Sequence, residues 1–239
     1  MTQSMSAQTP AVMAIEYSRR ELYGGAVSAE LPKDCIDASD LREVPDHQEV
    51  FLRPDTLTNI IFEINEYQQA GDVVAYNSDN EGLVDAEGAK PATEVIGADA
   101  AAANYHLKDI IAAQDRISEA GVETTAIRLP QSTVSKFPAY FTTATIIEPE
   151  IDRRSKPALP IDWQAQPDLT ENSTKTEQLL VRLKEYGTDL CVRINVPLKE
   201  YQGSQSEPAL TELAKANQIM QKILETISVE DFGLFGQEE

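Results

Sequence analysis

The sequence is poor in the residues that build metal centres and disulfide frameworks. Its 239 residues include only two cysteines and two histidines, and Cys35 and Cys191 cannot form a framework of disulfides. One long-range bridge between them stays open, although Cys191 fits better as a small buried strand residue. No cysteine lies near His47 or His106 in the sequence, so we expect no transition-metal site.

Basic residues are outnumbered two to one, and long apolar runs are missing. There are 20 Lys and Arg against 40 Asp and Glu, which gives a net charge of −20. Such a surface repels phosphate backbones and anionic lipid, so we expect no binding to nucleic acid or membranes. No apolar run reaches the roughly 18 residues of a membrane span. The first fifteen residues carry no charged side chain, so we expect neither the basic region of a secretory signal nor an Arg-rich transit helix. The charge favours a basic protein partner.

Motifs of catalysis and phosphate binding are also missing. The chain has neither the Gly-x-x-x-x-Gly-Lys loop that holds phosphates nor the Gly-x-Ser-x-Gly of a nucleophile elbow. Asp231-Phe232-Gly233 matches a kinase tripeptide, but no His-Arg-Asp loop precedes it, so Phe232 and Phe235 read as apolar anchors. Residues 77–82 resemble a calcium loop, but Gly88 stands where a bidentate Glu is needed. We therefore expect no catalytic residue, no metal and no cofactor.

Hydrophobic alternation predicts β-strands in both halves of the chain. The strongest pattern is at residues 179–196, where apolar residues alternate on both sides of Gly187. This pattern indicates an antiparallel hairpin. The expected strands cover residues 21–31, 49–53, 59–67, 122–129, 140–147, 179–184 and 190–196.

Two segments carry the spacing of amphipathic helices, residues 99–118 and 207–227. Ser206 can cap the second helix, and Pro208 lies in its first turn, where no N–H is needed. Its apolar stripe must be buried against a sheet. The order of the elements predicts an α+β fold with a central, mainly antiparallel sheet.

Composition divides the chain into four kinds of segment. Residues 1–16, rich in Ser, Thr, Gln and Ala, are expected to be a disordered leader. Residues 17–239 are expected to form a single domain. Within it, residues 71–98 read as an acidic loop insertion and residues 149–175 as a proline-rich loop insertion.

An acidic ladder runs from Asp34 to Glu49. We define it as the acids at every third position, with Arg42 as the one base among them. Three interpretations are open: a solvated face whose Asp residues cap turns, a general acid/base pair at Asp46 and Glu49, or an anionic docking patch. The ladder consists of Asp34, Asp37, Asp40, Glu43, Asp46 and Glu49.

Three segments resemble a known family. Leu22–Ala26, Ile36–Phe51 and Asp231–Phe235 are similar to signature segments of the Ran guanine-nucleotide release factors, the Mog family. The core of the match is Val-Pro-Asp-x-Gln-Glu-Val-Phe. His47 stands at the middle position, where the family often has Asn.

The resemblance implies both a fold and a function. The fold is that of the extrinsic PsbP proteins of photosystem II, with helices on both sides of an antiparallel sheet. The implied activity is binding to the GTPase Ran and promoting release of its guanine nucleotide, in support of nuclear protein import. We expect a monomer in the nucleus and cytoplasm that performs no covalent chemistry. The alternative is an interaction module with this fold for a different basic partner. The expected partner-binding residues are Asp46 and Glu49, with Asp37, Asp40, Glu43 and Gln48 in support.

Overall fold

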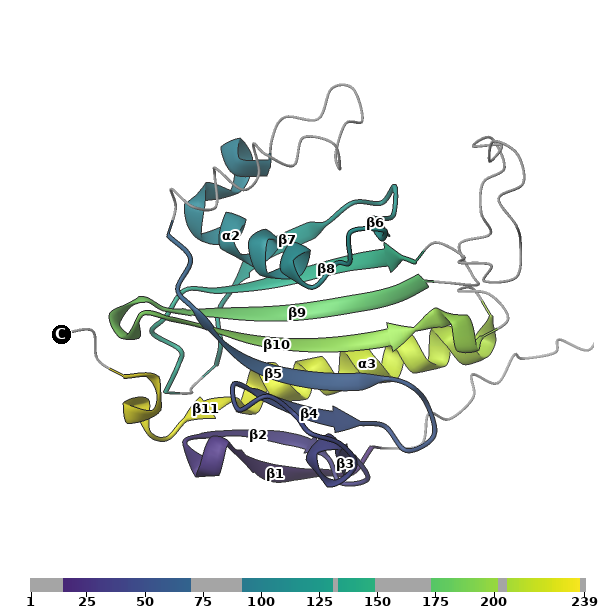
Figure 1. Cartoon of the computed structure of the whole chain (residues 1–239), viewed down its shortest axis with the longest axis horizontal. Coiled ribbons are helices and arrows are strands. Elements are labelled where there is room, and N and C mark those ends of the chain that lie inside the picture. The colour runs from purple at the N-terminus through teal and green to yellow at the C-terminus, as the bar shows by residue number, and fades with distance from the viewer. Residues whose placement is uncertain (1–14, 70–91, 131–132, 149–172, 202–205, 237–239) are drawn as a thin grey trace, which may run out of the picture.

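A large antiparallel sheet forms the centre of the computed structural model, which describes residues 15–69, 92–130, 133–148, 173–201 and 206–236 (Figure 1). All pairings between its strands are antiparallel. In spatial order the strands are β3 (Ile36–Asp37), β4 (Gln48–Leu52), β5 (Asn59–Glu66), β10 (Thr188–Pro197), β9 (Ser173–Leu183), β8 (Ala139–Ile147) and β6 (Arg116–Ile117), with β7 (Glu123–Ile127) also paired to β8.

A small three-stranded sheet lies beside the large one. It consists of β1 (Tyr17–Leu22), β2 (Val27–Pro32) and β11 (Ser228–Val229), in the order β1-β2-β11. The strand predicted at residues 21–31 is confirmed from Val27 onward as β2, but its first residues belong to the other arm and the turn of a hairpin, since Leu22 ends β1 and Tyr23–Gly25 reverse the chain. Gly24 and Gly25 take φ values of +65° and +94°, which suit a chain reversal better than a kinked strand.

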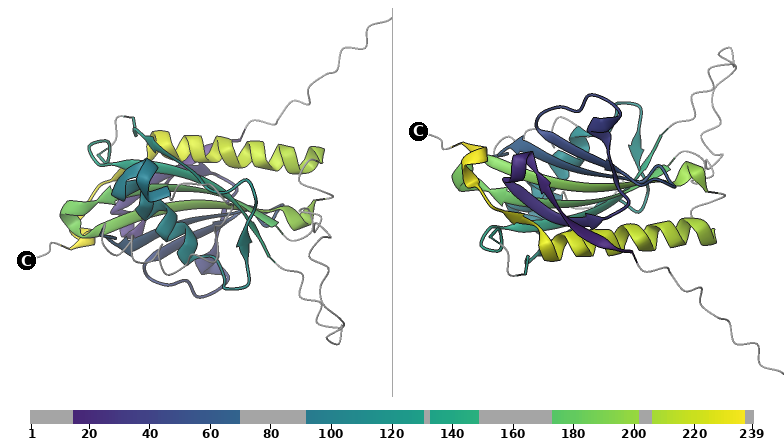
Figure 2. Two further views of the ribbon diagram at one scale, coloured as in Figure 1. Left: turned by 90° about the horizontal axis from the view of Figure 1, so that it is seen from above. Right: turned by 90° about the horizontal axis from the view of Figure 1, so that it is seen from below.

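Two helices cover opposite faces of the large sheet (Figure 2). They are α2 (Ala92–Asp109) and α3 (Glu207–Thr226). The side chain of Ser206 accepts a hydrogen bond from the N–H of Ala209, so the predicted cap of α3 is confirmed. The prediction of an α+β fold with a central antiparallel sheet between helices is also confirmed.

The main core lies between the large sheet, α3 and the small sheet. Phe62, Leu179 and Val192 of the large sheet are buried in the same cluster as Leu31 of β2 and Ile219 of α3. A smaller cluster lies under α2, where Ala101, Ala102 and Ala103 pack on Leu180 and Cys191. Both faces of β9 and β10 are therefore covered.

The helix predicted at residues 99–118 ends earlier than expected. α2 ends at Asp109, and Ile117 belongs to β6, where it pairs with Ile146. The apolar residues of this stretch face two different neighbours: Leu107 is buried on the helix, and Ile117 joins the sheet. Pairing at the edge of the sheet has overridden the helical spacing.

Much of the predicted leader and of both insertions lies outside the described residues. Within them, α2 begins at Ala92, inside the predicted loop 71–98, and β9 begins at Ser173, inside the predicted loop 149–175. The calcium-like residues 77–88 also lie outside. No helix in the described parts of the chain is long and apolar enough to cross a membrane.

Candidate functional site

The acidic ladder occupies the segment that joins the two sheets. It begins after β2, passes through β3 and the 3-10 helix η2 (Ala38–Asp40), and ends in β4. Asp37 caps η2, because its Oδ1 accepts hydrogen bonds from the N–H and the hydroxyl of Ser39 at 2.8 and 2.6 Å. Ala38 is fully buried, and its carbonyl accepts the N–H groups of Leu41 and Arg42. This turn is therefore fixed by a side-chain cap and by backbone hydrogen bonds.

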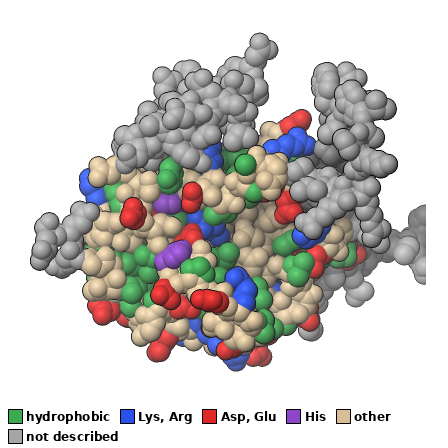
Figure 3. Space-filling model, viewed as in Figure 1, with side chains coloured by type: hydrophobic (Ala, Val, Ile, Leu, Met, Phe, Trp, Pro, Cys, Tyr) green, Lys and Arg blue, Asp and Glu red, His purple; other side chains and the backbone are tan. Residues whose placement is uncertain are grey.

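Three ladder acids project into solvent from this segment. Asp40, Glu43 and Asp46 are exposed, and no Lys or Arg of the described residues forms an ion pair with them. Asp34 differs, since it accepts a hydrogen bond from Arg53 at 2.7 Å. Figure 3 shows acidic side chains gathered over the β3–β4 region of this face. A concentrated and uncompensated negative charge results.

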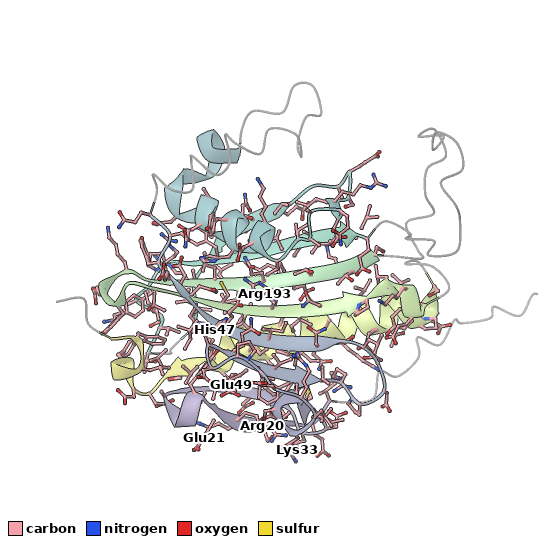
Figure 4. The ribbon with its side chains drawn as sticks, viewed as in Figure 1. Arg20, Glu21, Lys33, His47, Glu49 and Arg193 are labelled. Atoms are coloured by element: carbon pink, nitrogen blue, oxygen red, sulfur yellow. The ribbon has the colours of Figure 1, made fainter. Side chains whose placement is uncertain are left out.

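Glu49 is held more tightly than the other acids. It is half-buried, and its Oε1 accepts the backbone N–H of Tyr23 at 2.7 Å. The hydroxyl of Tyr23 donates to the carbonyl of His47 at 3.1 Å, and that carbonyl also accepts the N–H of Ile64 at 2.9 Å. Figure 4 labels His47 and Glu49 beside β4. Burial, and then the charge of Glu49, raises the pKa of Tyr23, so the phenol stays protonated and donates.

Gln48 faces the opposite side of β4, into a polar layer under α2. Its amide donates to Glu63 at 2.6 Å, and Glu63 also accepts from Asn65 and Arg193. Arg193 donates further to Gln178 at 2.9 Å. Gln48 thus links β4 to β5 on the face of the sheet that α2 covers.

A second buried group, missed from the sequence, joins α2 to the sheet. Asp189 is fully buried, and its Oδ2 contacts His106 at 2.7 Å and accepts from Arg182 at 2.8 Å. Arg182 also donates to the carbonyl of Gln68 at 2.7 Å and lies over the ring of Tyr67. In the sequence, Arg182 and Asp189 stand out as charged residues within strands of alternating apolar residues. That these two side chains are buried follows only from the position of α2 over the sheet.

Asp46 and Glu49 line neither of two surface hollows found in the described part of the chain. One, of about 330 Å³, lies at the start of α3 between Thr56, Tyr201 and Glu212. The other, of about 480 Å³, lies between the Tyr23–Gly25 turn and residues 231–234. Neither hollow therefore supplies the enclosed pocket around Asp46 and Glu49 that an acid/base pair requires. The described residues also contain no cluster of three or more metal-binding side chains.

Sequence comparison matches this chain to a family model and to relatives that cover most of its length. A family model described as "Ran-interacting Mog1 protein" matches residues 20–197. The Ran guanine nucleotide release factor of Danio rerio is 27% identical over 222 residues, which are 91% of this chain and 99% of that protein. The nuclear import protein MOG1 of Saccharomyces cerevisiae is 28% identical over 221 residues, covering 90% and 83% of the two chains.

A solved structure shows the same fold. The crystal structure of the Saccharomyces cerevisiae Ran-binding protein Mog1p superimposes with a TM-score of 0.54 at 22% sequence identity. The match covers 93% of this chain and 100% of that one.

Proposed function

The chain belongs to the family of Ran-interacting Mog1 proteins, as the resemblance predicts, and we propose on this premise that it binds Ran and promotes release of its guanine nucleotide. The curated relatives that match over most of the chain carry the names of a Ran guanine nucleotide release factor and a nuclear import protein. We extend the proposal to a regulator without covalent chemistry that acts in nuclear import, as a monomer in the nucleus and cytoplasm.

One observation supports the acidic ladder as the Ran-binding surface. Asp40, Glu43 and Asp46 are exposed and lack internal basic partners among the described residues. Asp40 ends the capped helix η2, and Asp46 lies in a turn that the N–H of Gln48 closes on the carbonyl of Pro45 at 2.8 Å. Because these acids have no ion pair within the described chain, they are available to a basic partner. The ladder also lies within the residues that the family model matches.

Each predicted site residue receives a part in this proposal. Asp46 and Glu49 contact Ran, with Asp37, Asp40 and Glu43 as rim charges. Gln48 supports the position of β4 and does not contact Ran, because its amide donates to Glu63. Asp37 contributes similarly by capping η2.

Nucleotide release follows from competition between two conformations of the GTPase. A GTPase holds the anionic nucleotide with basic and polar groups. An acidic partner that engages basic residues near that site favours a conformation that holds nucleotide poorly. Linkage requires reciprocity: if the protein weakens nucleotide affinity by some factor, nucleotide weakens the protein's affinity by the same factor. No catalytic residue is needed.

Release of a fluorescent guanine nucleotide from purified Ran tests the proposal. We expect the protein to accelerate release in a saturable manner, with a rate of association that falls as salt screens the charges. Its affinity for nucleotide-free Ran should exceed that for loaded Ran by the same factor by which it weakens nucleotide binding. Binding without accelerated release would restrict the function to an interaction module. A Ran pull-down that stays empty at low salt would point to a different basic partner.

A further inference from the structure

Tyr23 has an unusual backbone conformation. It is the one non-glycine residue of the described chain with a positive φ, at +51°. Gly24 and Gly25 follow it with φ values of +65° and +94°. Glycine takes this region without penalty, but a bulky side chain does so at a cost and persists there only when its surroundings require it.

The unusual conformation brings two donors of one residue onto the end of the ladder. The N–H of Tyr23 lies 2.7 Å from Oε1 of Glu49, and its hydroxyl lies 3.1 Å from the carbonyl oxygen of His47. The two bonds bracket the start of β4, directly after Asp46. The bond to Glu49 is assisted by the carboxylate's charge and is therefore stronger than a neutral one.

Oε1 of Glu49 is thereby bound, and its other oxygen is left for a partner. No hydrogen bond or ion pair to Oε2 occurs among the described residues, and the side chain is half-buried. A fixed carboxylate loses little rotamer entropy when it binds a cation, so a preorganised acid contributes more to affinity than a free one.

The turn that carries Tyr23 is itself fastened from the other side. The carbonyl of Ala26 accepts the N–H groups of Glu230 and Asp231 at 2.8 and 3.2 Å. β11 pairs with β2, with Ser228 opposite Ser28. The turn that carries Tyr23 is thus held by the small sheet, while Tyr23 itself is hydrogen-bonded to the start of β4 in the large sheet.

We infer that Tyr23 is a positioning residue for the Ran-binding surface: its N–H orients Glu49, and its hydroxyl fixes the backbone between Asp46 and Glu49. The inference rests on the proposed function, since it concerns how the same acids are presented to Ran. It assigns Tyr23 no contact with Ran.

Substitution of single atoms at Tyr23 and Glu49 separates positioning from folding. Tyr23→Phe removes the hydroxyl alone, and we expect Ran affinity to fall by about 2- to 10-fold, as for the loss of one hydrogen bond. Tyr186→Phe is the matched control, because the hydroxyl of Tyr186 forms no hydrogen bond within the described chain and its ring stacks on Phe232, which is not a ladder residue. It should bind Ran as the wild type does.

A spectroscopic readout tests the positioning without Ran. In two-dimensional NMR of the free protein, Glu49→Ala should shift the Tyr23 amide upfield, because the hydrogen bond from that amide to the carboxylate is lost. Glu49→Gln keeps an oxygen acceptor and should shift the amide less. A Tyr23 amide that does not respond to Glu49→Ala, or a folded Tyr23→Phe variant that binds Ran as tightly as the wild type, would overturn the inference. A Tyr23 amide that responds to Glu49→Ala in a protein that never binds Ran would overturn the proposed function, and the role of Tyr23 in binding with it.

Discussion

Arg193 on β10 donates to the carboxylate of Glu63 on β5, and both side chains are buried beneath α2. Burial acts to raise the pKa of Glu63, but the charge and hydrogen bonds of Arg193, with help from Asn65 and Gln48, hold that pKa below its ordinary value. A carboxyl with a lowered pKa stabilises the fold above its unfolded pKa of about 4.3. This stabilisation is lost as the pH falls through the folded pKa.

Glu63→Gln should therefore destabilise the protein at neutral pH. The variant leaves a buried guanidinium without its counter-charge, for which we expect a loss of about 3–5 kcal/mol in the free energy of unfolding. The difference in unfolding free energy between the variant and the wild type should become smaller at low pH, where Glu63 of the wild type also becomes protonated. Urea unfolding at pH 7 and pH 3.5 measures both values. Glu66→Gln, an exposed acid on the same strand, should be nearly neutral; an equal loss there would contradict the assignment.

Glu177→Gln should have the opposite effect. Glu177 is buried on β9, its Oε2 has no hydrogen-bond partner among the described residues, and burial raises its pKa despite a hydrogen bond with Asn217. An acid with a raised pKa weakens the fold as the pH rises through that pKa. We expect Glu177→Gln to increase unfolding free energy at pH 7 by about 1 kcal/mol and to change it little near pH 3.5. A destabilised variant at pH 7 would refute this.

Reversal of charge on the ladder should weaken Ran binding. Asp46→Lys and Glu49→Lys should each cost well over the ~1 kcal/mol expected of a rim charge, with the melting temperature nearly unchanged for the exposed Asp46. Glu119→Lys makes the same charge change in an exposed turn near the other edge of the sheet, beside β6. Calorimetry at two salt concentrations compares the three. If Asp46→Lys and Glu119→Lys lose the same amount of Ran affinity, the effect comes from the net charge of the protein and not from the ladder.

Excision of residues 71–91 should leave the fold intact. The chain on either side is tied down: Gln68 contacts Arg182 and Asp189, and the hydroxyl of Tyr67 donates to Asp99 at 3.4 Å. A short Gly-Ser linker in place of the segment should change the melting temperature by only about 2 °C. It also removes five acids and one lysine, so association with Ran should slow slightly. A large fall in melting temperature would show that the segment supports the core.

Both cysteines should react slowly with thiol reagents in the native protein. Cys35 and Cys191 are buried and unbridged, and burial raises the pKa of their thiols to about 11 and about 12. Only a small fraction is thiolate at pH 8, and that fraction is covered. Ellman's reagent should modify both thiols rapidly in urea and slowly without it. Rapid native reaction of either thiol would indicate local opening.

Local patterns predicted the hairpin of β9 and β10 and the capped helix α3, because alternation and capping depend on neighbours in the sequence. They did not predict the buried roles of Arg182 and Arg193. Alternation tells which residues share a face, but a distant helix decides whether that face is covered.

The candidate site, too, could be predicted from the sequence only in part. The ladder is visible in the sequence as a charge pattern. Which acids remain unpaired is not, since Asp34 pairs with Arg53 and Glu49 binds Tyr23 through contacts that span 19 and 26 residues.

The pairing of β11 with β2 also has a consequence for biosynthesis. Ser228 lies 200 residues beyond its partner Ser28, and a ribosome adds about 5–20 residues per second. The hairpin that carries Tyr23 therefore waits about 10–40 s for its third strand. The ladder acids of a nascent chain are therefore synthesised long before β11 can pair with β2, so recognition of the GTPase should become possible only after residue 229 has left the ribosome.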